Sequence, residues 1–182
     1  MVEEKKIPEG WEEIELKNIL KVKHGKSQKD VESYNGKFPI LGTGGEIGRA
    51  NSYLYNKPSV LIGRKGTIDS PQYTEYPFWS IDTLFYTEIN SNINPKYVYY
   101  IFQTIDWRSY NEGSGVPSLN SKIIESINIR MPVKQLEQQA IAIALSNIDN
   151  LILSLEKLIS KKKLIKQGTM QQILTGKKRL DV

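Results

Sequence analysis

The sequence contains no cysteine and a single histidine, His24, among its 182 residues. The absence of cysteine excludes disulfide bonds, thiolate metal sites and a cysteine nucleophile. One histidine is too few for a metal site built from imidazole groups. The sequence has no run of about 18 apolar residues that could span a membrane, and its first residues lack the apolar core of a signal peptide. We therefore expect a cytoplasmic protein that does not enter a membrane.

Motifs for catalysis and cofactor binding are equally scarce. His24 has no serine or carboxylate at a spacing that suggests a catalytic triad, and the aspartates are too scattered to suggest a paired site. A dinucleotide fingerprint starting at Gly42 would need glycine where Ile47 stands. A phosphate loop ending at residues 25–27 would need glycine where Leu20 stands. We expect no catalytic residue, no metal and no cofactor.

Charge divides the chain into two unlike parts. Residues 1–130 hold 16 basic and 16 acidic side chains, whereas residues 131–182 hold 9 basic and 4 acidic ones and so account for the net charge of +5. Within the first part, residues 17–65 contain ten bases and three acids. A local excess of this size is typical of a face that meets phosphate groups. A solvated, lysine-rich surface is the ordinary alternative.

Residues 1–132 predict a mixed α/β domain, or more loosely an α+β domain, made of short elements. Apolar, aromatic and β-branched runs bounded by glycine and proline predict strands at residues 11–16, 38–41, 60–62, 78–89 and 127–130. Dense glycine predicts loops at residues 42–48 and 113–117 and a tight turn at residues 63–66. Short helices are expected at residues 16–25 and 118–125, and a longer one is opened by Asn94 as N-cap with Pro95 after it.

The glycine-rich loops and the cations beside them are the candidate contacts with nucleic acid. Glycine lets a backbone approach a groove closely, arginine and asparagine can read base edges, and lysine and serine can hold phosphates. Ordinary surface loops are the alternative. The candidate DNA-binding residues are Lys23, Lys26, Thr43, Gly44, Arg49, Arg64, Lys65, Gly66, Thr67, Ser114, Ser118 and Asn120.

The C-terminal residues predict one long amphipathic helix from about residue 136 to residue 174. A heptad pattern begins at Ile141, and its apolar stripe is wider than that of a bare two-stranded seam. Such a helix needs a partner, because burial of the apolar face supplies most of its stability. The candidate dimer-interface residues are Ile141, Ala144, Leu145, Ile148, Leu151, Ile152, Leu155, Leu158 and Ile159.

An ordered set of short motifs resembles a known family. The motifs are Gly10-Trp11, Phe38-Pro39-Ile40-Leu41-Gly42, Ile62-Gly63-Arg64-Lys65-Gly66-Thr67-Ile68, Ile81-Asp82-Thr83-Leu84-Phe85, Glu137-Gln138, Ile148-Asp149 and Ile173-Leu174-Thr175-Gly176-Lys177. In this order they resemble the specificity subunits of type I restriction–modification systems, and the resemblance covers essentially the whole chain. The family's subunit holds two target-recognition domains, each followed by a long helix, and the two helices pair antiparallel. This chain has one domain and one helix, so it resembles half a subunit.

The resemblance implies a target-recognition domain at residues 1–132 and a long α-helical spacer at residues 133–182 that forms an antiparallel coiled coil. It implies a non-catalytic protein that reads a bipartite site in double-stranded DNA for a modification methyltransferase and, where present, a restriction subunit. Those partners would bind S-adenosylmethionine and ATP, and two copies of this chain would pair as a homodimer. Two other readings stay open: a docking or oligomerisation protein without sequence-specific DNA reading, and the recognition portion of a fused restriction–methylation enzyme.

Overall fold

The computed structural model describes residues 6–180 of the chain. The chain divides into two compact units, one ending at Ala142 and one beginning at Ile143. We call residues 6–142 the head and residues 143–180 the arm. The predicted boundary at residue 132 marks the last strand of the head, whereas the compact unit also includes the first two turns of the helix that follows.

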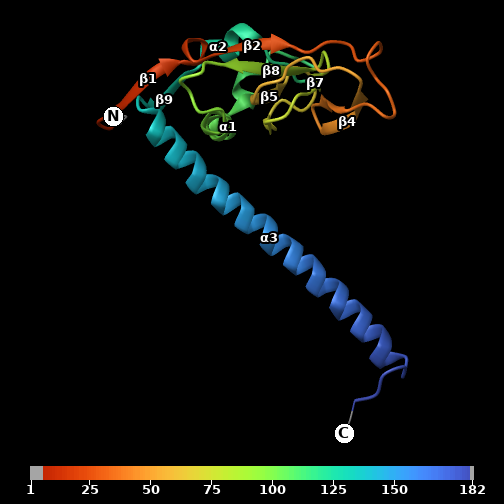
Figure 1. The fold of residues 1–182 in the computed structure, drawn as a ribbon. Coiled ribbons are helices and arrows are strands. Elements are labelled where there is room, and N and C mark those ends of the chain that lie inside the picture. Colours follow the sequence, from red (N-terminus) through yellow and green to blue (C-terminus); the bar gives the residue numbers. More distant parts are fainter. Residues whose placement is uncertain (1–5, 181–182) are drawn as a thin grey trace. The chain divides into compact units, whose positions relative to one another are not determined.

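The head is a mixed α+β domain, as the sequence predicted. Three sheets have the strand orders β1-β9, β2-β8-β5-β6 and β4-β3-β7, and all their pairings are antiparallel except β3 with β7 (Figure 1). The elements are β1 Trp11–Glu15, η1 Leu16–Asn18, β2 Leu20–His24, β3 Phe38–Gly42, β4 Gly45–Ala50, β5 Ser59–Gly63, β6 Gln72–Thr74, β7 Trp79–Ser80, β8 Leu84–Ile89, α1 Pro95–Thr104, η2 Trp107–Tyr110, α2 Ser121–Glu125, β9 Asn128–Pro132 and α3 Gln135–Leu174.

Strand β5 lies at the centre of the core, and all five of its residues are buried. Because successive side chains of a strand point to opposite faces, Val60 and Ile62 join one apolar cluster and Leu61 joins another. The first cluster contains Val98 and the rest of the buried face of α1, while the second contains Phe78. A strand covered on both faces reads as a continuous apolar run, which explains the predicted strand at residues 60–62.

Two local predictions about the first half of the head were wrong. Residues 16–25 form a single 3₁₀ turn and then strand β2, because Leu20 and Val22 are buried while Lys21 is exposed, a period of two. The predicted loop at residues 42–48 is mostly strand β4, which is irregular at the turn before Gly45 (φ +110°) and at a register shift in its pairing with β3 between Ile40 and Leu41. Hydrogen bonds from β3 override the low strand propensity of glycine there.

The predicted strand at residues 78–89 is interrupted. In a turn between the two halves, the Leu84 amide donates to the Ile81 carbonyl at 3.0 Å, so β7 joins the small sheet and β8 joins the large one.

Helix α2 begins three residues later than predicted, because the side chain of Asn120 caps it by accepting from the Lys122 amide at 2.9 Å. The longer predicted helix is confirmed as α1, whose N-cap Asn94 accepts from the Tyr97 amide at 2.9 Å.

The first turns of α3 are fastened to the head through a buried glutamine. Gln138 is 1% exposed, its Nε2 donates to the Pro132 carbonyl at 3.0 Å, and its Oε1 accepts from the Asn94 amide at 3.0 Å. Burial, and secondarily the carboxylate of Glu137, raises the pKa of Tyr97 to about 12. The tyrosine in this packed region is therefore neutral throughout the physiological pH range.

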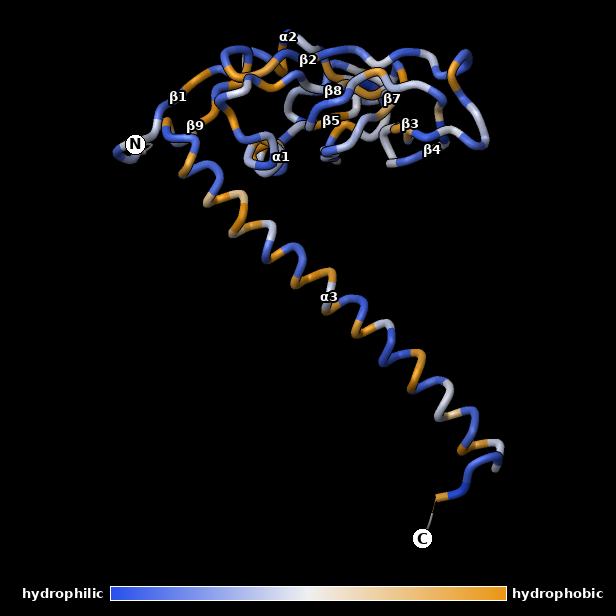
Figure 2. Tube along the Cα trace, in the orientation of Figure 1, coloured by the Kyte–Doolittle hydropathy of each residue, from blue (hydrophilic) through white to orange (hydrophobic). Residues whose placement is uncertain are grey.

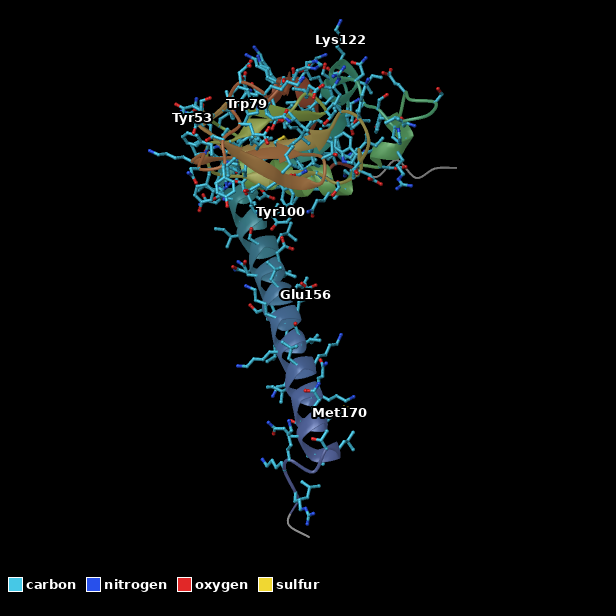
Figure 3. The ribbon with its side chains drawn as sticks, turned by 90° about the vertical axis from the view of Figure 1, so that its right-hand side faces the viewer. Tyr53, Trp79, Tyr100, Lys122, Glu156 and Met170 are labelled. Atoms are coloured by element: carbon cyan, nitrogen blue, oxygen red, sulfur yellow. The ribbon has the colours of Figure 1, made fainter. Side chains whose placement is uncertain are left out.

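Helix α3 continues without interruption to Leu174, and from Ile143 onward it forms the arm. Its apolar side chains remain exposed, for example Leu151 at 59% and Leu158 at 49%. Figure 2 shows apolar and polar residues alternating along its whole length, and Figure 3 shows Glu156 and Met170 projecting from its surface. In residues 6–180, no helix is long and apolar enough to cross a membrane.

We predict that replacing Gln138 by leucine destabilises the head. The substitution keeps most of the volume but leaves the Asn94 amide and the Pro132 carbonyl without their partners, which should cost about 2 kcal/mol of unfolding free energy. Chemical denaturation of Gln138→Leu measures this loss. The matched control is Gln139→Leu, since Gln139 is exposed on the same helix turn and should change stability little. Equal stability of the two variants would contradict the fastening role.

Candidate nucleic-acid interface

Several strand ends meet at one end of the head. Strands β2 and β5 both run antiparallel to β8, with His24 opposite Phe85 and Gly63 opposite Leu84. The last residues of β2 and β5 therefore lie beside the first residues of β8. In the small sheet, Leu41 near the end of β3 lies beside Ser80. We call the segments that follow these strand ends the loop end of the head: residues 25–26, 42–45, 63–67 and 81–83, with residues 113–118 bonded to them.

The turn at residues 63–67 and the loop at residues 113–118 form one unit. Lys65 and Ser118 form a β-bridge, the Gly66 amide donates to the Pro117 carbonyl at 2.9 Å, and the Leu119 amide donates to the Arg64 carbonyl at 2.9 Å. Gly66 has φ +91°, which favours glycine at the tip of the turn. The structure thus joins two loops that the sequence places about fifty residues apart.

The two cationic side chains of the turn, Arg64 and Lys65, have different environments. The Arg64 Nη1 donates to the Asp82 carbonyl at 3.2 Å, and the Arg64 amide donates to the Thr83 carbonyl at 2.8 Å. Lys65 is exposed at the tip. The arginine is therefore held over the turn between β7 and β8, while the lysine reaches outward.

Asn111 holds the second loop in place. Its Oδ1 accepts from the amides of Gly113 and Ser118 at 2.9 and 2.8 Å, and its Nδ2 donates to the Gly113 carbonyl at 3.0 Å. Beside it, Arg108 Nε donates to Asp69 at 2.7 Å, and this hydrogen bond lowers the pKa of the Asp69 carboxyl. These side chains line a cavity of about 270 Å³ behind the loop.

A second group of predicted residues lies at the ends of β2 and β3. The Lys26 amide donates to the Ser80 carbonyl at 2.8 Å, and the Lys26 carbonyl accepts from Trp79 Nε1 at 3.0 Å. Gln72 Nε2 donates to the carbonyls of Gly42 and Thr43 at 2.8 and 3.1 Å. Together these bonds fix the backbone of Lys26, Thr43 and the neighbouring Gly44 turn at the loop end.

Some predicted contact residues lie elsewhere or are already engaged. Lys23 pairs with Glu88 at 3.3 Å on the surface of the large sheet, and Arg49 pairs with Glu46 at 2.9 Å near the end of β4. Asn120 serves as the cap of α2. The structure brings the others to the loop end: Lys26, Thr43, Gly44, Arg64, Lys65, Gly66, Thr67, Ser114 and Ser118.

Sequence reasoning missed the residues that position these loops. Asn111, Gln72 and Trp79 donate or accept the hydrogen bonds just described, yet none stands in a glycine-rich segment. The only local signal was Asn111 two residues before Gly113, a spacing at which an asparagine side chain commonly bonds the backbone ahead of it.

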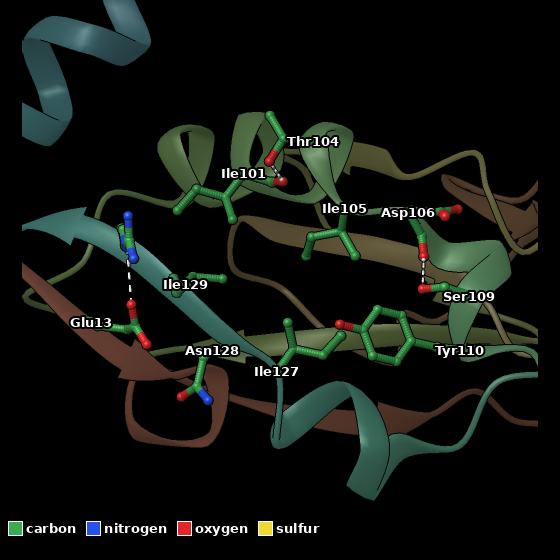
Figure 4. A pocket seen from close by; sticks show the side chains of 11 residues that line it. Glu13, Ile101, Thr104, Ile105, Asp106, Ser109, Tyr110, Ile127, Asn128 and Ile129 are labelled. Carbon is green, nitrogen blue, oxygen red and sulfur yellow. Dashed lines mark hydrogen bonds and ion pairs between the residues drawn. The ribbon is translucent and has the colours of Figure 1, made fainter. Parts of the chain in front are cut away.

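A cavity of about 510 Å³ lies apart from these loops, between the end of α1 and strands β1 and β9 (Figure 4). Arg130 Nε donates to Glu13 at 3.0 Å, and Ser109 Oγ donates to the Asp106 carbonyl at 2.7 Å, so these polar groups already have partners. We place no predicted DNA contact in this cavity.

Comparison with known proteins decides the family. Residues 8–167 match the model of the type I restriction modification DNA specificity domain, which is most of the chain. The chain belongs to this family. The match includes the loop end of the head and most of the arm, so the two units described above are both parts of the specificity domain.

Relatives of this specificity domain are longer proteins. The type I restriction enzyme MjaVIII specificity subunit of Methanocaldococcus jannaschii is 25% identical over 195 residues, covering 93% of this chain and 43% of that protein. The EcoDI specificity subunit of Escherichia coli is 25% identical over 69 residues, or 38% of this chain and 16% of that protein. The chain thus spans less than half the length of these relatives.

Solved structures share the fold. The S subunit of a type I restriction–modification system from M. genitalium has a TM-score of 0.71 at 17% identity, covering 94% of this chain and 47% of that one. The HsdS subunit from Thermoanaerobacter tengcongensis has a TM-score of 0.68 at 14% identity, covering 93% and 46%. The mixed head followed by a long helix is therefore the specificity-subunit fold, as the resemblance implied.

We predict that Asn111→Ala loosens the loop at residues 113–118. Loss of the side-chain acceptor leaves the amides of Gly113 and Ser118 without their partner, so both should exchange hydrogen with solvent faster. Amide hydrogen exchange followed by NMR measures the change. Asn111→Asp keeps the acceptor oxygen and should preserve slow exchange at both amides. Similar exchange in Asn111→Ala and the unaltered chain would rule out the holding role.

Proposed function

We propose that this chain is the DNA-recognition subunit of a type I restriction–modification enzyme, with the loop end of its head as the DNA-reading surface. The observation that carries the proposal is the joined pair of loops at residues 63–67 and 113–118 in a chain of the specificity-domain family. The joined loops present Arg64, Lys65 and exposed backbone on a rigid support. Rigid placement matters because base contacts discriminate only when their geometry is held.

The two cations suit different contacts. Arg64 has a planar guanidinium that can bond two acceptors of one guanine edge, and its bond to the Asp82 carbonyl sets its direction before DNA arrives. Lys65 and Lys26 are exposed point charges suited to phosphate oxygens.

Other residues of the loop end suit weaker or closer contacts. The hydroxyl groups of Ser114, Ser118 and Thr67 can donate hydrogen bonds, and Gly44 and Gly66 allow the backbone close to the groove. Lys23, Arg49 and Asn120 remain secondary candidates, since each already has a protein partner.

The subunit itself would carry out no chemistry. Its relatives are named as specificity subunits, and one similar structure was solved to explain complex assembly and conformational transition of the type I system, at TM-score 0.73 and 16% identity. A DNA modification methyltransferase, and a restriction subunit where one is present, would supply catalysis and bind the cofactors. We place the methyltransferase contact on the arm, whose polar residues include Asn147, Gln167, Gln171 and Gln172.

We propose that the arm pairs antiparallel with the arm of a second copy. The stripe formed by Ile141, Ala144, Leu145, Ile148, Leu151, Ile152, Leu155, Leu158 and Ile159 is the interface. Its members from Leu145 onward are 36–59% exposed in the single chain, so pairing would bury apolar surface that otherwise faces water. An antiparallel pair has a twofold axis perpendicular to the helices and sets one head at each end. Twofold symmetry then implies a palindromic target with two half-sites separated by about one DNA turn or more.

The decisive experiment is to co-express the chain with a methyltransferase encoded beside it and to map methylated bases across the genome. The proposal expects methylation confined to one interrupted palindrome and dependent on this chain. Methylation that is unchanged when the chain is omitted would contradict it. The mapped motif also supplies the specific duplex for binding measurements.

We predict that Arg64→Ala weakens binding to that duplex by about 1–3 kcal/mol if Arg64 reads a base edge. If it contacts only phosphate, affinity should fall on all sequences and the slope of log affinity against log salt should decrease by about 1. Fluorescence anisotropy at several salt concentrations separates the two cases. The control is Lys57→Ala, which removes one positive charge just before the start of β5, at the end of this strand away from the turn at residues 63–67. Unaltered binding by the double variant Arg64→Ala, Lys65→Ala would remove the turn from the interface.

We predict that the double variant Leu155→Lys, Leu158→Lys no longer dimerises, because the paired arms would have to bury four ammonium groups at their seam. Sedimentation velocity at micromolar concentration reports the change in mass, and binding to the bipartite duplex should be lost with it. The matched control is Leu153→Lys, Leu164→Lys, which alters two exposed leucines outside the stripe and should leave the dimer intact. A monomeric unaltered chain, in the absence of any partner, would overturn the homodimer.

A further inference from the structure

The connection between β2 and β3, residues 25–37, presents one aromatic side chain entirely to solvent. Tyr34 is 100% exposed, whereas Phe38, which begins the next strand, is partly covered and packs edge-on to Tyr53 with ring centroids 5.1 Å apart. The connection leaves the end of β2 at the loop end, and its turn at residues 31–36 is bonded to the end of β4 away from the hairpin turn (Figure 1). A fully exposed aromatic ring is unusual, because aromatic side chains readily pack against other groups.

The backbone that carries Tyr34 is firmly held. The Ser33 amide donates to the Arg49 carbonyl at 2.9 Å, the Asn51 amide donates to the Val31 carbonyl at 2.9 Å, and the Gly36 amide donates to the Ser33 carbonyl at 3.0 Å. The turn is thus bonded along the outer edge of β4, and Glu32 forms a β-bridge with Ala50.

Gly36 shows how closely this turn approaches the strand. A Cβ atom at this position would lie 2.5 Å from the Ala50 amide nitrogen, so no other residue fits without moving the backbone. Anchors on both sides of Tyr34 therefore set where its ring stands. Positioning a ring in advance lowers the entropy lost when it meets a partner.

The chemistry around Tyr34 suits a polyanion with apolar faces. Lys29 and Lys37 are exposed in the same connection, and Ser33 and Asn35 flank the ring with hydrogen-bonding groups. Asp30 and Glu32 offset part of this charge, so the connection is only weakly basic and ionic attraction alone would not give strong binding. The ring itself must supply contact area.

We propose that Tyr34 is a DNA-contact residue that packs its ring against the duplex beside the half-site, at a sugar or a partly opened base step in a groove. This proposal rests on the proposed function of the head. Side chains that pack in this way read the shape and deformability of DNA in addition to its base edges. Tyr34 would therefore add affinity for steps that open easily, at positions that the turn at residues 63–67 does not touch.

The test compares Tyr34→Ala, Tyr34→Phe and the control Tyr76→Ala. Tyr76 is also largely exposed, at 73%, but its loop follows β6, an edge strand of the large sheet, whereas the turn that carries Tyr34 is bonded to β4 of the small sheet. Binding is measured by fluorescence anisotropy for the full chain in complex with its methyltransferase. The probe is a duplex with the motif mapped by methylation, carrying 2-aminopurine at successive positions around each half-site.

Tyr34→Ala should weaken binding about thirtyfold, the middle of the range for removing one aromatic–base contact. Tyr34→Phe should stay within about twofold, since it keeps the ring, and Tyr76→Ala should match the unaltered chain. The unaltered complex should change the fluorescence of one 2-aminopurine position, and Tyr34→Ala should abolish that change.

Three results would overturn the proposal: full affinity in Tyr34→Ala, an equal loss in Tyr34→Phe, or an equal loss in Tyr76→Ala. The second would assign the effect to the hydroxyl group and the third to nonspecific disturbance of the head. None of these results would contradict the proposed function, because the unaltered complex would still bind its site. If the unaltered complex does not prefer the mapped duplex over a scrambled one, the proposed function fails, and this proposal fails with it.

Discussion

The backbone of residues 80–83 is the constraint on which the loop end depends. The Ser80 carbonyl accepts from Lys26, the Ile81 amide donates to Leu41, and the Thr83 carbonyl accepts from Arg64. One short turn thereby joins the ends of β2, β3 and β5, which come from two different sheets. Residues 113–118 are then added through their bonds to residues 64–66. The loop end, which is assembled from five separate segments, is thus held together mainly by hydrogen bonds between backbone groups.

The head buries its apolar side chains within the single chain, whereas the arm does not. In the head, β5 is covered on both faces, and Gln138 joins the beginning of α3 to the end of β9 and the start of α1. From Ile143 onward, the same helix has no buried side chain among the described residues. A helix of this kind owes most of its stability to packing of its apolar stripe, so the arm is the part of the chain whose folded state is tied to association. In the proposed function, recognition and assembly are therefore carried by different units.

The length of the chain bears on how it would work. The similar solved subunits are about twice as long, and this chain covers 47% of the M. genitalium S subunit and 46% of the T. tengcongensis HsdS subunit. Two copies paired through their arms, as proposed, would together be about as long as one of these subunits. The symmetric pair would be limited to identical half-sites, because both heads have the same sequence.

Local patterns in the sequence were sufficient wherever local energetics dominate. Asn94 followed by Pro95 located the start of α1, the apolar run at residues 60–62 located β5, and the heptad stripe located α3. Glycine and the adjacent cations also pointed to the turn at residues 63–67, because φ +91° at Gly66 is a local backbone requirement. The specificity-subunit family was likewise recognisable from the order of short motifs.

Other features were decided only by tertiary structure. β4 is a strand despite its glycines because β3 supplies its hydrogen bonds, and residues 78–89 split because their two halves pair in different sheets. Asn111 holds the loop at residues 113–118, and Arg49 forms a salt bridge with Glu46 instead of lying at the loop end. The alignment of the loops depends on partners distant in sequence, such as Arg64 with Thr83 and Lys26 with Ser80. Hydrogen bonds between distant segments depend on how the chain packs in three dimensions, and no local spacing of residues encodes that packing.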